Sequence, residues 1–111
     1  METYEAVLEA LGDRTRRHIV DLLRAGPSSV GELAAVLPVS RPAVSQHLMV
    51  LRRNGLVSYS DHGTRNVYRL DTAGLRDLRA WLDSFWDLAL DRYAQRVRED
   101  SLDIGAQPRH E

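Results

Sequence analysis

Apolar residues recur along this chain of 111 residues at two spacings, one typical of helices and the other of strands. The helical spacing of i, i+3, i+4 and i+7 is found first at Tyr4, Val7, Leu8 and Leu11. Glycine, proline or a capping residue follows each such stretch and ends the helix there. Four short helices are predicted in this way, over residues 3–11, 14–25, 30–37 and 41–54.

Two later segments, 56–61 and 65–70, alternate apolar and polar residues, which is the pattern of half-buried strands. The residues between them, 62–64, are His, Gly and Thr, which suit a turn. We therefore predict a β-hairpin here. Earlier in the chain, the two serines at 28–29 form a short link that could be a strand residue or a cap.

A long last helix is predicted over residues 73–98, with Asp71 and Thr72 as its cap. The tail over 99–111 is polar, contains a glycine and a proline, and is predicted to be disordered. The chain length suits one domain, which we place at residues 1–98. The predicted fold class is mainly α with a small β-hairpin, in the order α-α-α-α-β-β-α.

The helix predicted over residues 41–54 has two faces of different chemistry. Val44, Leu48 and Leu51 recur at i, i+4 and i+7 and must face the core. The opposite side carries arginine, serine, glutamine and histidine, whose donors and acceptors suit base edges in the DNA major groove. Together with the preceding helix and the link over residues 37–40, this helix forms a helix-turn-helix candidate.

A hairpin that directly follows a helix-turn-helix has the form of a wing, and Arg65 lies at its tip. Such a tip can reach a phosphate or the minor groove. We expect Arg41, Ser45 and Gln46 to read bases, whereas the two arginines that end the helix meet phosphates. His47 is expected either to pack or to contact DNA. The full set predicted to bind DNA is Ser40, Arg41, Pro42, Ser45, Gln46, His47, Arg52, Arg53 and Arg65.

Charge is distributed unevenly, although the formal net charge of the whole chain is only −1. Residues 40–69 hold five arginines and one acidic residue, whereas residues 1–39 and 70–111 are net acidic. A basic middle between acidic flanks indicates one face for a polyanion and another for a different partner. A solvated helix face would explain the outward side of the helix alone, but the wing and the basic segment together favour DNA binding.

Three motifs give the chain a family resemblance. They are the runs LGDRTR from Leu11, SRPAVSQHL from Ser40 and GLV from Gly55. With them the sequence resembles the ArsR/SmtB family of bacterial repressors over about residues 4–95. The resemblance implies a winged helix-turn-helix, a homodimer, and repression of a target promoter, commonly the protein's own, by occupation of an operator in double-stranded DNA.

The residues that bind metal in many members of that family are missing from this sequence. The chain has no cysteine, and alanine or valine stands within residues 32–36 where the family's thiolate site would place sulfur. The predicted last helix has no histidine for the family's other site, and the four histidines lie on four different segments. We therefore expect no metal site and no cofactor.

Apolar residues cover so much of the last helix that a domain of this size cannot bury them all. The resemblance implies that the first and last helices form the interface of a homodimer, which would read a pseudo-palindromic operator. The residues predicted at this interface are Tyr4, Val7, Leu8, Leu11, Trp81, Phe85, Trp86, Leu90 and Tyr93. The alternative is that the aromatic residues among them line a pocket for an unidentified small-molecule effector.

Other classes of function find less support in the sequence. No apolar run is long enough to span a membrane, and the N-terminus lacks the basic segment of a signal peptide, so we expect a cytoplasmic protein. No Ser/His/Asp set, phosphate loop or metal cluster indicates an enzyme. The other binding hypothesis is a winged-helix interaction module that holds an acidic protein partner in place of DNA.

Overall fold

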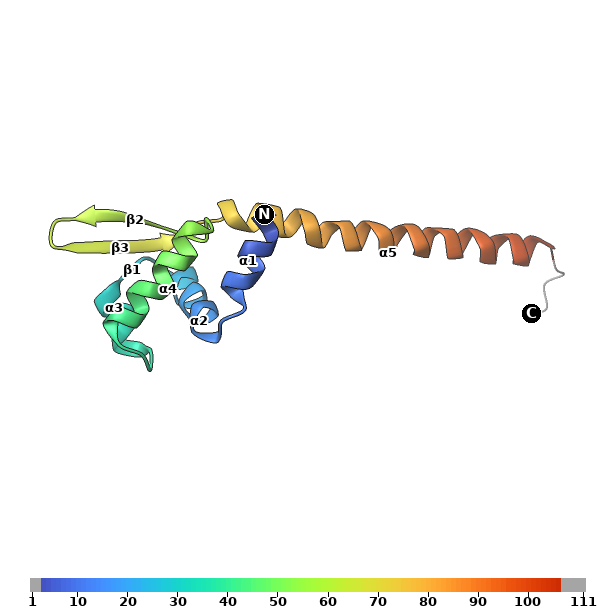
Figure 1. Cartoon of the computed structure of the whole chain (residues 1–111). Helices are drawn as coiled ribbons and strands as arrows, with labels where there is room; N and C mark the ends of the chain where they lie inside the picture. The colour runs from blue at the N-terminus through green and yellow to red at the C-terminus, as the bar shows by residue number, and fades with distance from the viewer. Residues whose placement is uncertain (1–2, 107–111) are drawn as a thin grey trace. The chain divides into compact units, whose positions relative to one another are not determined.

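The computed structural model describes the backbone of residues 3–106 and the side chains of residues 4–101. The chain divides into two units, Met1–Arg79 and Ala80–Glu111, and the last helix belongs to both. The mainly α fold with a small antiparallel sheet is confirmed (Figure 1). The elements are α1 (Thr3–Leu11), α2 (Arg14–Ala25), β1 (Ser28–Ser29), α3 (Val30–Val36), α4 (Arg41–Arg53), β2 (Val57–His62), β3 (Arg65–Leu70) and α5 (Ala73–Ala106).

Local capping interactions fix where three helices begin. Before α2, the backbone N–H of Arg16 donates to Asp13 Oδ1 at 3.0 Å. Before α4, Ser40 Oγ accepts a backbone N–H from three residues further on at 3.3 Å. Before α3, Ser29 Oγ accepts the N–H of Glu32 at 3.2 Å, and the Glu32 carboxylate accepts the N–H of Ser29 at 2.8 Å. This reciprocal pair is a capping box, which satisfies two donors that the start of a helix leaves open.

The sheet has three antiparallel strands in the order β1-β3-β2. The two serines at 28–29 serve in both expected ways, because they form β1 against β3 and Ser29 also caps α3. The hairpin predicted between the last two strands is confirmed. It closes at the pair His62 and Arg65, and Gly63 in the turn has φ 71°, in the left-handed region that favours glycine.

The core of the first unit draws on all its helices and on the start of the hairpin. Val44, Leu48 and Leu51 of α4 are completely buried, as their spacing predicts. The largest fully buried side chains are Val7, Ile19, Leu33, Val44, Leu48, Leu51, Leu56 and Val57. Burial of one such side chain stabilises the fold by about 1.5–3 kcal/mol.

Val7 was predicted at a subunit interface, but the structure corrects this assignment. Its side chain has 0% exposed surface and belongs to the core, because α1 packs against α2 within the first unit. The apolar stripe of α1 therefore divides. Leu8 is 39% exposed and keeps a surface that a partner could cover, whereas Val7 does not.

The last helix is longer than predicted, because α5 continues to Ala106 instead of ending near residue 98. Residues 99–104 are polar enough to suggest a tail, yet they contain no glycine or proline that would break a helix. The predicted end of this helix at residue 98 is therefore wrong. The rest of the predicted tail, residues 107–111, lies outside the described residues.

The start of α5 and the end of α4 approach each other backbone to backbone. The N–H of Gly74 donates to the carbonyl of Gly55 at 2.8 Å, and a side chain at Gly74 would collide with the carbonyl of Asn54. Gly55 has φ 69°, which also favours glycine. This contact ties both ends of the hairpin to the end of α4.

Candidate nucleic-acid interface

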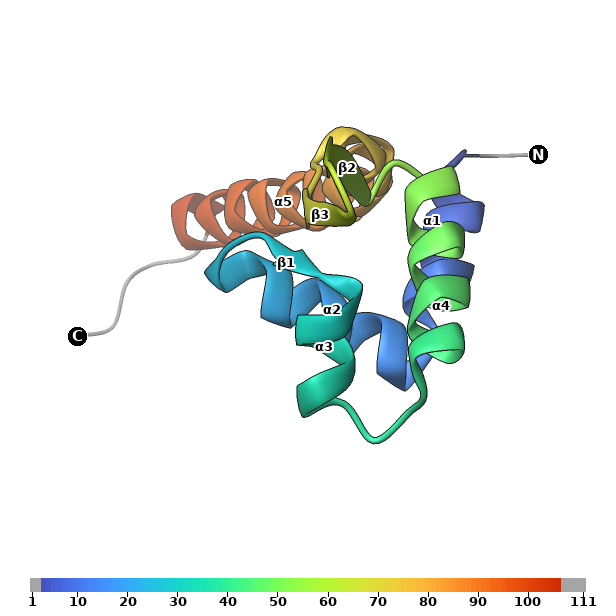
Figure 2. The ribbon, with the colours of Figure 1, turned by 90° about the vertical axis from the view of Figure 1, so that its left-hand side faces the viewer.

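Helix α4 presents to solvent the face that the sequence predicts. Around the buried residues of this helix, all but one of the predicted DNA-binding side chains between 40 and 53 are exposed. The exposed ones are Ser40, Arg41, Pro42, Ser45, Gln46, Arg52 and Arg53. Figure 2 shows the first unit with the hairpin pointing toward the reader and α4 lying lengthwise beside it. Helix α4 and the hairpin are therefore neighbours within the first unit.

Ser45 and Gln46 have the freest side chains on this face. Both are exposed, and neither makes a hydrogen bond within the described residues. A hydroxyl and a carboxamide without protein partners can donate to and accept from another molecule without breaking an existing contact. Near the N-terminal half of the helix, they have the chemistry that reads base edges.

Arg41 lies across the neighbouring helix rather than pointing away from α4. Its guanidinium covers the Cα of Gly31 in α3 so closely that a side chain at Gly31 would collide with it. Arg41 also lines an open groove of about 640 Å3, together with Glu32 of α3 and with Arg65 at the tip of the hairpin. The structure therefore groups Arg41 with the wing, and its predicted role as a base reader finds no support in this position.

Arg65, the predicted wing residue, is exposed but has a partner in the protein. Its NH2 group donates to Glu32 Oε1 at 3.1 Å, and both side chains remain more than half exposed. Hydrogen bonds from the backbone and side chain of Ser29, followed by the charge of Arg65, hold the pKa of the Glu32 carboxyl below its ordinary value. Glu32 is consequently a fixed anion on one side of the groove.

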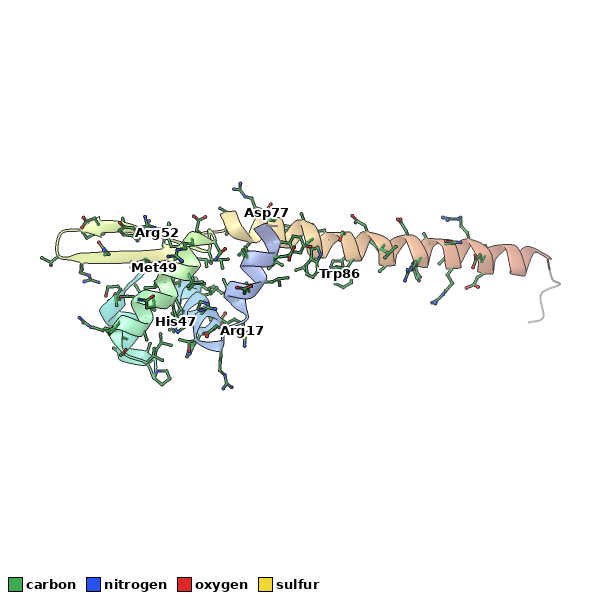
Figure 3. All side chains as sticks on the ribbon, in the orientation of Figure 1. Arg17, His47, Met49, Arg52, Asp77 and Trp86 are labelled. Atoms are coloured by element: carbon green, nitrogen blue, oxygen red, sulfur yellow. The ribbon has the colours of Figure 1, made fainter. Side chains whose placement is uncertain are left out.

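The far end of α4 is joined to the hairpin through an aromatic contact. The guanidinium of Arg52 lies 4.1 Å from the centroid of the Tyr59 ring, and that ring stacks on Tyr68 at 5.5 Å. Figure 3 labels Arg52 and Met49 on this stretch of α4. Arg53 donates to the sulfur of Met49 at 3.3 Å. Both arginines stay exposed, so their guanidinium groups can meet phosphates while their stems are held.

His47 is the predicted DNA-binding residue that faces partly inward. It is half-buried, and its Nδ1 lies 3.3 Å from NH1 of Arg16, whose Nε donates to the carbonyl of Ala10 at 2.6 Å. The hydrogen bond from the Arg16 N–H, aided by the charges of His47 and Arg16, holds the pKa of Asp13 below its ordinary value. His47 thus joins α4 to the start of α2, which is the packing role that the sequence left open.

Four residues of this surface were not singled out from the sequence. Gly31 and Glu32 hold the arginines of the groove, Tyr59 holds Arg52, and Arg16 holds His47. The serine and glutamate at 29 and 32 carry the spacing of a capping box, a signal that could have placed Glu32 at the start of a helix but not beside the wing.

The residues predicted at a dimer interface are mostly exposed on the second unit. Phe85 is 53% exposed, Trp86 67%, Leu90 63% and Tyr93 64%. Trp81 is half-buried and meets Phe85 edge to face, with ring centroids 5.0 Å apart. Trp86 is labelled on α5 in Figure 3. On the first unit, Tyr4 and Leu11 are half-buried.

Two further findings concern metal ligands and membrane spans in the described part of the structure. Among the residues it describes, no three histidine, aspartate or glutamate side chains are grouped so that they could hold a metal ion. Within residues 3–106, no helix is both long enough and apolar enough to cross a membrane.

A helix-turn-helix followed by a basic hairpin defines the class of winged helix-turn-helix proteins, and comparison with known proteins gives the family. The model for the bacterial regulatory proteins of the arsR family matches residues 13–59. The HTH-type transcriptional regulator Rv2034 of Mycobacterium tuberculosis is 53% identical over 106 residues, which are 93% of this chain and 99% of that protein. The transcriptional repressor SdpR of Bacillus subtilis is 35% identical over 71% of this chain and 88% of its own.

Solved structures agree with this result. The crystal structure of a possible transcriptional regulator for arsenical resistance superposes with a TM-score of 0.67 and 45% identity, over 86% of this chain and 96% of that one. The ArsR family transcriptional regulator RHA00566 gives a TM-score of 0.72 at 26% identity, over 78% and 90%. This chain belongs to the ArsR family of bacterial regulatory proteins. It is a DNA-binding transcriptional regulator, not an enzyme.

Proposed function

We propose that this regulator is a sequence-specific repressor that binds a pseudo-palindromic operator as a homodimer and needs no metal to do so. The observation that carries the proposal is the exposed face of α4 beside the basic hairpin, with Ser45 and Gln46 unengaged and arginines around them. The name of SdpR as a transcriptional repressor supports the direction of regulation. Such a protein would act in the cytoplasm, where bacterial DNA lies.

The exposed side chains divide into readers and anchors. Ser45 and Gln46 would read base edges, because a carboxamide can bond adenine on two atoms in the major groove. Arg52, Arg53 and Arg65 would neutralise phosphates, which fixes the register of the protein on DNA without reading sequence. Arg41 would also be a phosphate anchor instead of a base reader, because its guanidinium lies over α3 in the groove that it shares with Arg65.

A homodimer is supported by the apolar stripe on α5. Trp86, Leu90, Tyr93 and Val97 follow one another at spacings of four and three residues, and each is more than 40% exposed. A second copy of the helix would cover this stripe, and a dimeric repressor of this class reads two half-sites about 34 Å apart, one turn of DNA. Absence of metal sensing is supported by the sequence, which offers no cysteine anywhere and no histidine between residues 73 and 98.

A small-molecule effector at the same interface is the second candidate, as a property added to the repressor. The edge-to-face pair of Trp81 and Phe85, with exposed Trp86 beside it, offers aromatic surface from which a second subunit could close a pocket. Such a ligand would act only through different affinities for the DNA-binding and released states.

The test is a binding titration of the purified protein on a labelled fragment of its own promoter region, with a shuffled fragment of equal length and composition as the competitor. We expect preference for the promoter, and a salt dependence with a slope of about −0.9 per phosphate neutralised. Gln46→Ala should relax the preference, whereas Gln95→Ala, on α5, should leave it unchanged. Equal affinity of the wild-type protein for both fragments at every salt concentration would contradict the proposal.

A further inference from the structure

The groove between α3 and the hairpin holds opposite charges in direct contact. Arg65 reaches back from the tip of the hairpin, and its NH2 group donates to Glu32 Oε1 at 3.1 Å. Arg41 lines the same groove from the start of α4. These three side chains come from three different elements, so the tertiary fold alone brings them together.

Glu32 differs from an ordinary surface carboxylate because the fold fixes its position. Its Oε1 also accepts the backbone N–H of Ser29 at 2.8 Å, and its own N–H donates to Ser29 Oγ at 3.2 Å. The capping box therefore holds the carboxylate at the start of α3, and the carboxylate cannot move away without losing its hydrogen bond to the Ser29 N–H.

We propose that Glu32 is a positioning residue that competes with DNA for Arg65, holding the wing arginine in the free protein and releasing it when a DNA phosphate arrives. This inference rests on the proposed function, because it assumes that Arg65 binds a phosphate. The physical reason is that carboxylate and phosphate oxygens are equivalent partners for a guanidinium. The negative charge of Glu32 would also repel an approaching phosphate, so a phosphate that takes Arg65 must both break the ion pair and overcome that repulsion.

Gly31 and Arg41 give the groove a second cation that Glu32 does not engage. Because Gly31 has no side chain, the Arg41 guanidinium can pack closely against α3 within the groove that Arg65 also lines. A phosphate in this groove would be within reach of two arginines once the Glu32–Arg65 pair opened. The affinity of the wing for any DNA then depends on how well a DNA phosphate competes with the Glu32 carboxylate for Arg65.

The variant that isolates this competition is Glu32→Gln. Glutamine serves equally well at this position of a capping box, so the start of α3 keeps its hydrogen bonds while the negative charge is lost. Asp61→Asn is the matched control, because Asp61 is an exposed acid on the same hairpin that makes no ion pair in the described part of the chain. It reports how much affinity is gained by removing any negative charge near the DNA.

The experiment is a double-mutant cycle of Glu32→Gln and Arg65→Gln, read as dissociation constants on the promoter fragment and on shuffled DNA at one salt concentration. We expect Glu32→Gln to tighten binding to both DNAs by about two- to fivefold beyond the control, the range for release of an exposed ion pair. In the Arg65→Gln background, the same substitution should give no more than the gain of the control. Thermal unfolding of each variant checks that the fold is intact.

Three outcomes separate the possibilities. A gain from Glu32→Gln that is equal in both backgrounds would overturn the proposal, because it would be a general effect of charge. A loss of affinity in the wild-type background would also overturn it, since Glu32 would then hold Arg65 ready for DNA. If Arg65→Gln changes neither DNA affinity nor its salt dependence, the proposed phosphate contact of the wing fails, whatever Glu32 does.

Discussion

The two units of this chain treat their apolar residues in opposite ways. In the first unit, α2, α3 and α4 each bury large apolar side chains, including Ile19, Leu33 and Leu48, each with 1% exposed surface or less. In the second unit, Phe85, Trp86 and Leu90 are each more than half exposed on α5. The first unit has a buried apolar core within one chain, whereas the second leaves a run of large apolar side chains exposed.

This difference suits the first unit to DNA binding and the second unit to association with another copy. A packed first unit holds α4 and the hairpin in fixed positions, which a surface that reads DNA requires. In the proposed homodimer, the exposed apolar stripe of α5 would serve association, because its burial between two copies would stabilise the dimer. Substitutions in the first unit should therefore be tested by measurements of folding stability, and those on α5 by measurements of association.

The largest effect is expected in the core of the first unit. Leu48→Ala should lower the free energy of unfolding by about 2–5 kcal/mol, because it leaves a cavity under the recognition helix at a residue with no exposed surface. Urea denaturation followed by circular dichroism measures it. Met49→Ala, at the exposed neighbour, is the control, and equal losses for the two variants would refute the division between core and surface on α4.

The next largest effect is expected on the exposed apolar stripe of α5, in the second unit. Leu90→Asp should raise the dissociation constant of the dimer by at least about tenfold, since it places an unpaired charge within an apolar interface. Analytical ultracentrifugation measures the change. Gln95→Asp, on the opposite side of α5 from the stripe, should leave association unchanged. Dissociation caused equally by both variants would show that the stripe is not the contact surface.

A smaller effect concerns the cap at the start of α2. Asp13→Ala should cost about 1 kcal/mol, because the N–H of Arg16 loses its acceptor. The lowered pKa of Asp13 sets the direction of the pH dependence of stability. The stabilisation by Asp13 is complete at a pH well above its ordinary pKa of 3.8, and it is lost as the pH falls through the lower pKa of the folded state. Asp13→Asn should keep the cap and lose this pH dependence, which acid titration of stability tests.

The smallest expected effect lies where α4 meets the hairpin. Tyr59→Leu should weaken the hold on Arg52 by about 0.5–1 kcal/mol, the usual value of an exposed cation–π contact. A double-mutant cycle with Arg52→Ala in urea denaturation isolates this coupling. A coupling of zero would mean that the ring and the guanidinium are neighbours without energetic consequence.

Some of the site could be predicted because its determinants are local. Ser40 caps α4 through a backbone N–H three residues away, and Val44, Leu48 and Leu51 bury one face by their spacing alone. These features need only the helical period and the chemistry of a cap. The exposed positions of Ser45 and Gln46 follow from the same period. The ends of helices were harder to predict from the sequence. Because the residues after 98 are mostly polar, the continuation of α5 to Ala106 was not predicted.

By itself, the sequence determined the order of elements, the faces of α4 and the basic middle segment, since propensity, spacing and charge are properties of neighbouring residues. Only the tertiary structure decided which partner each cation has. Arg65 meets Glu32 across 33 positions, and Arg16 meets His47 across 31. Such pairs depend on how α2, α3, α4 and the hairpin pack together, and no local period records that packing. For the same reason Val7, which shares a stripe with exposed Leu8, is buried in the core.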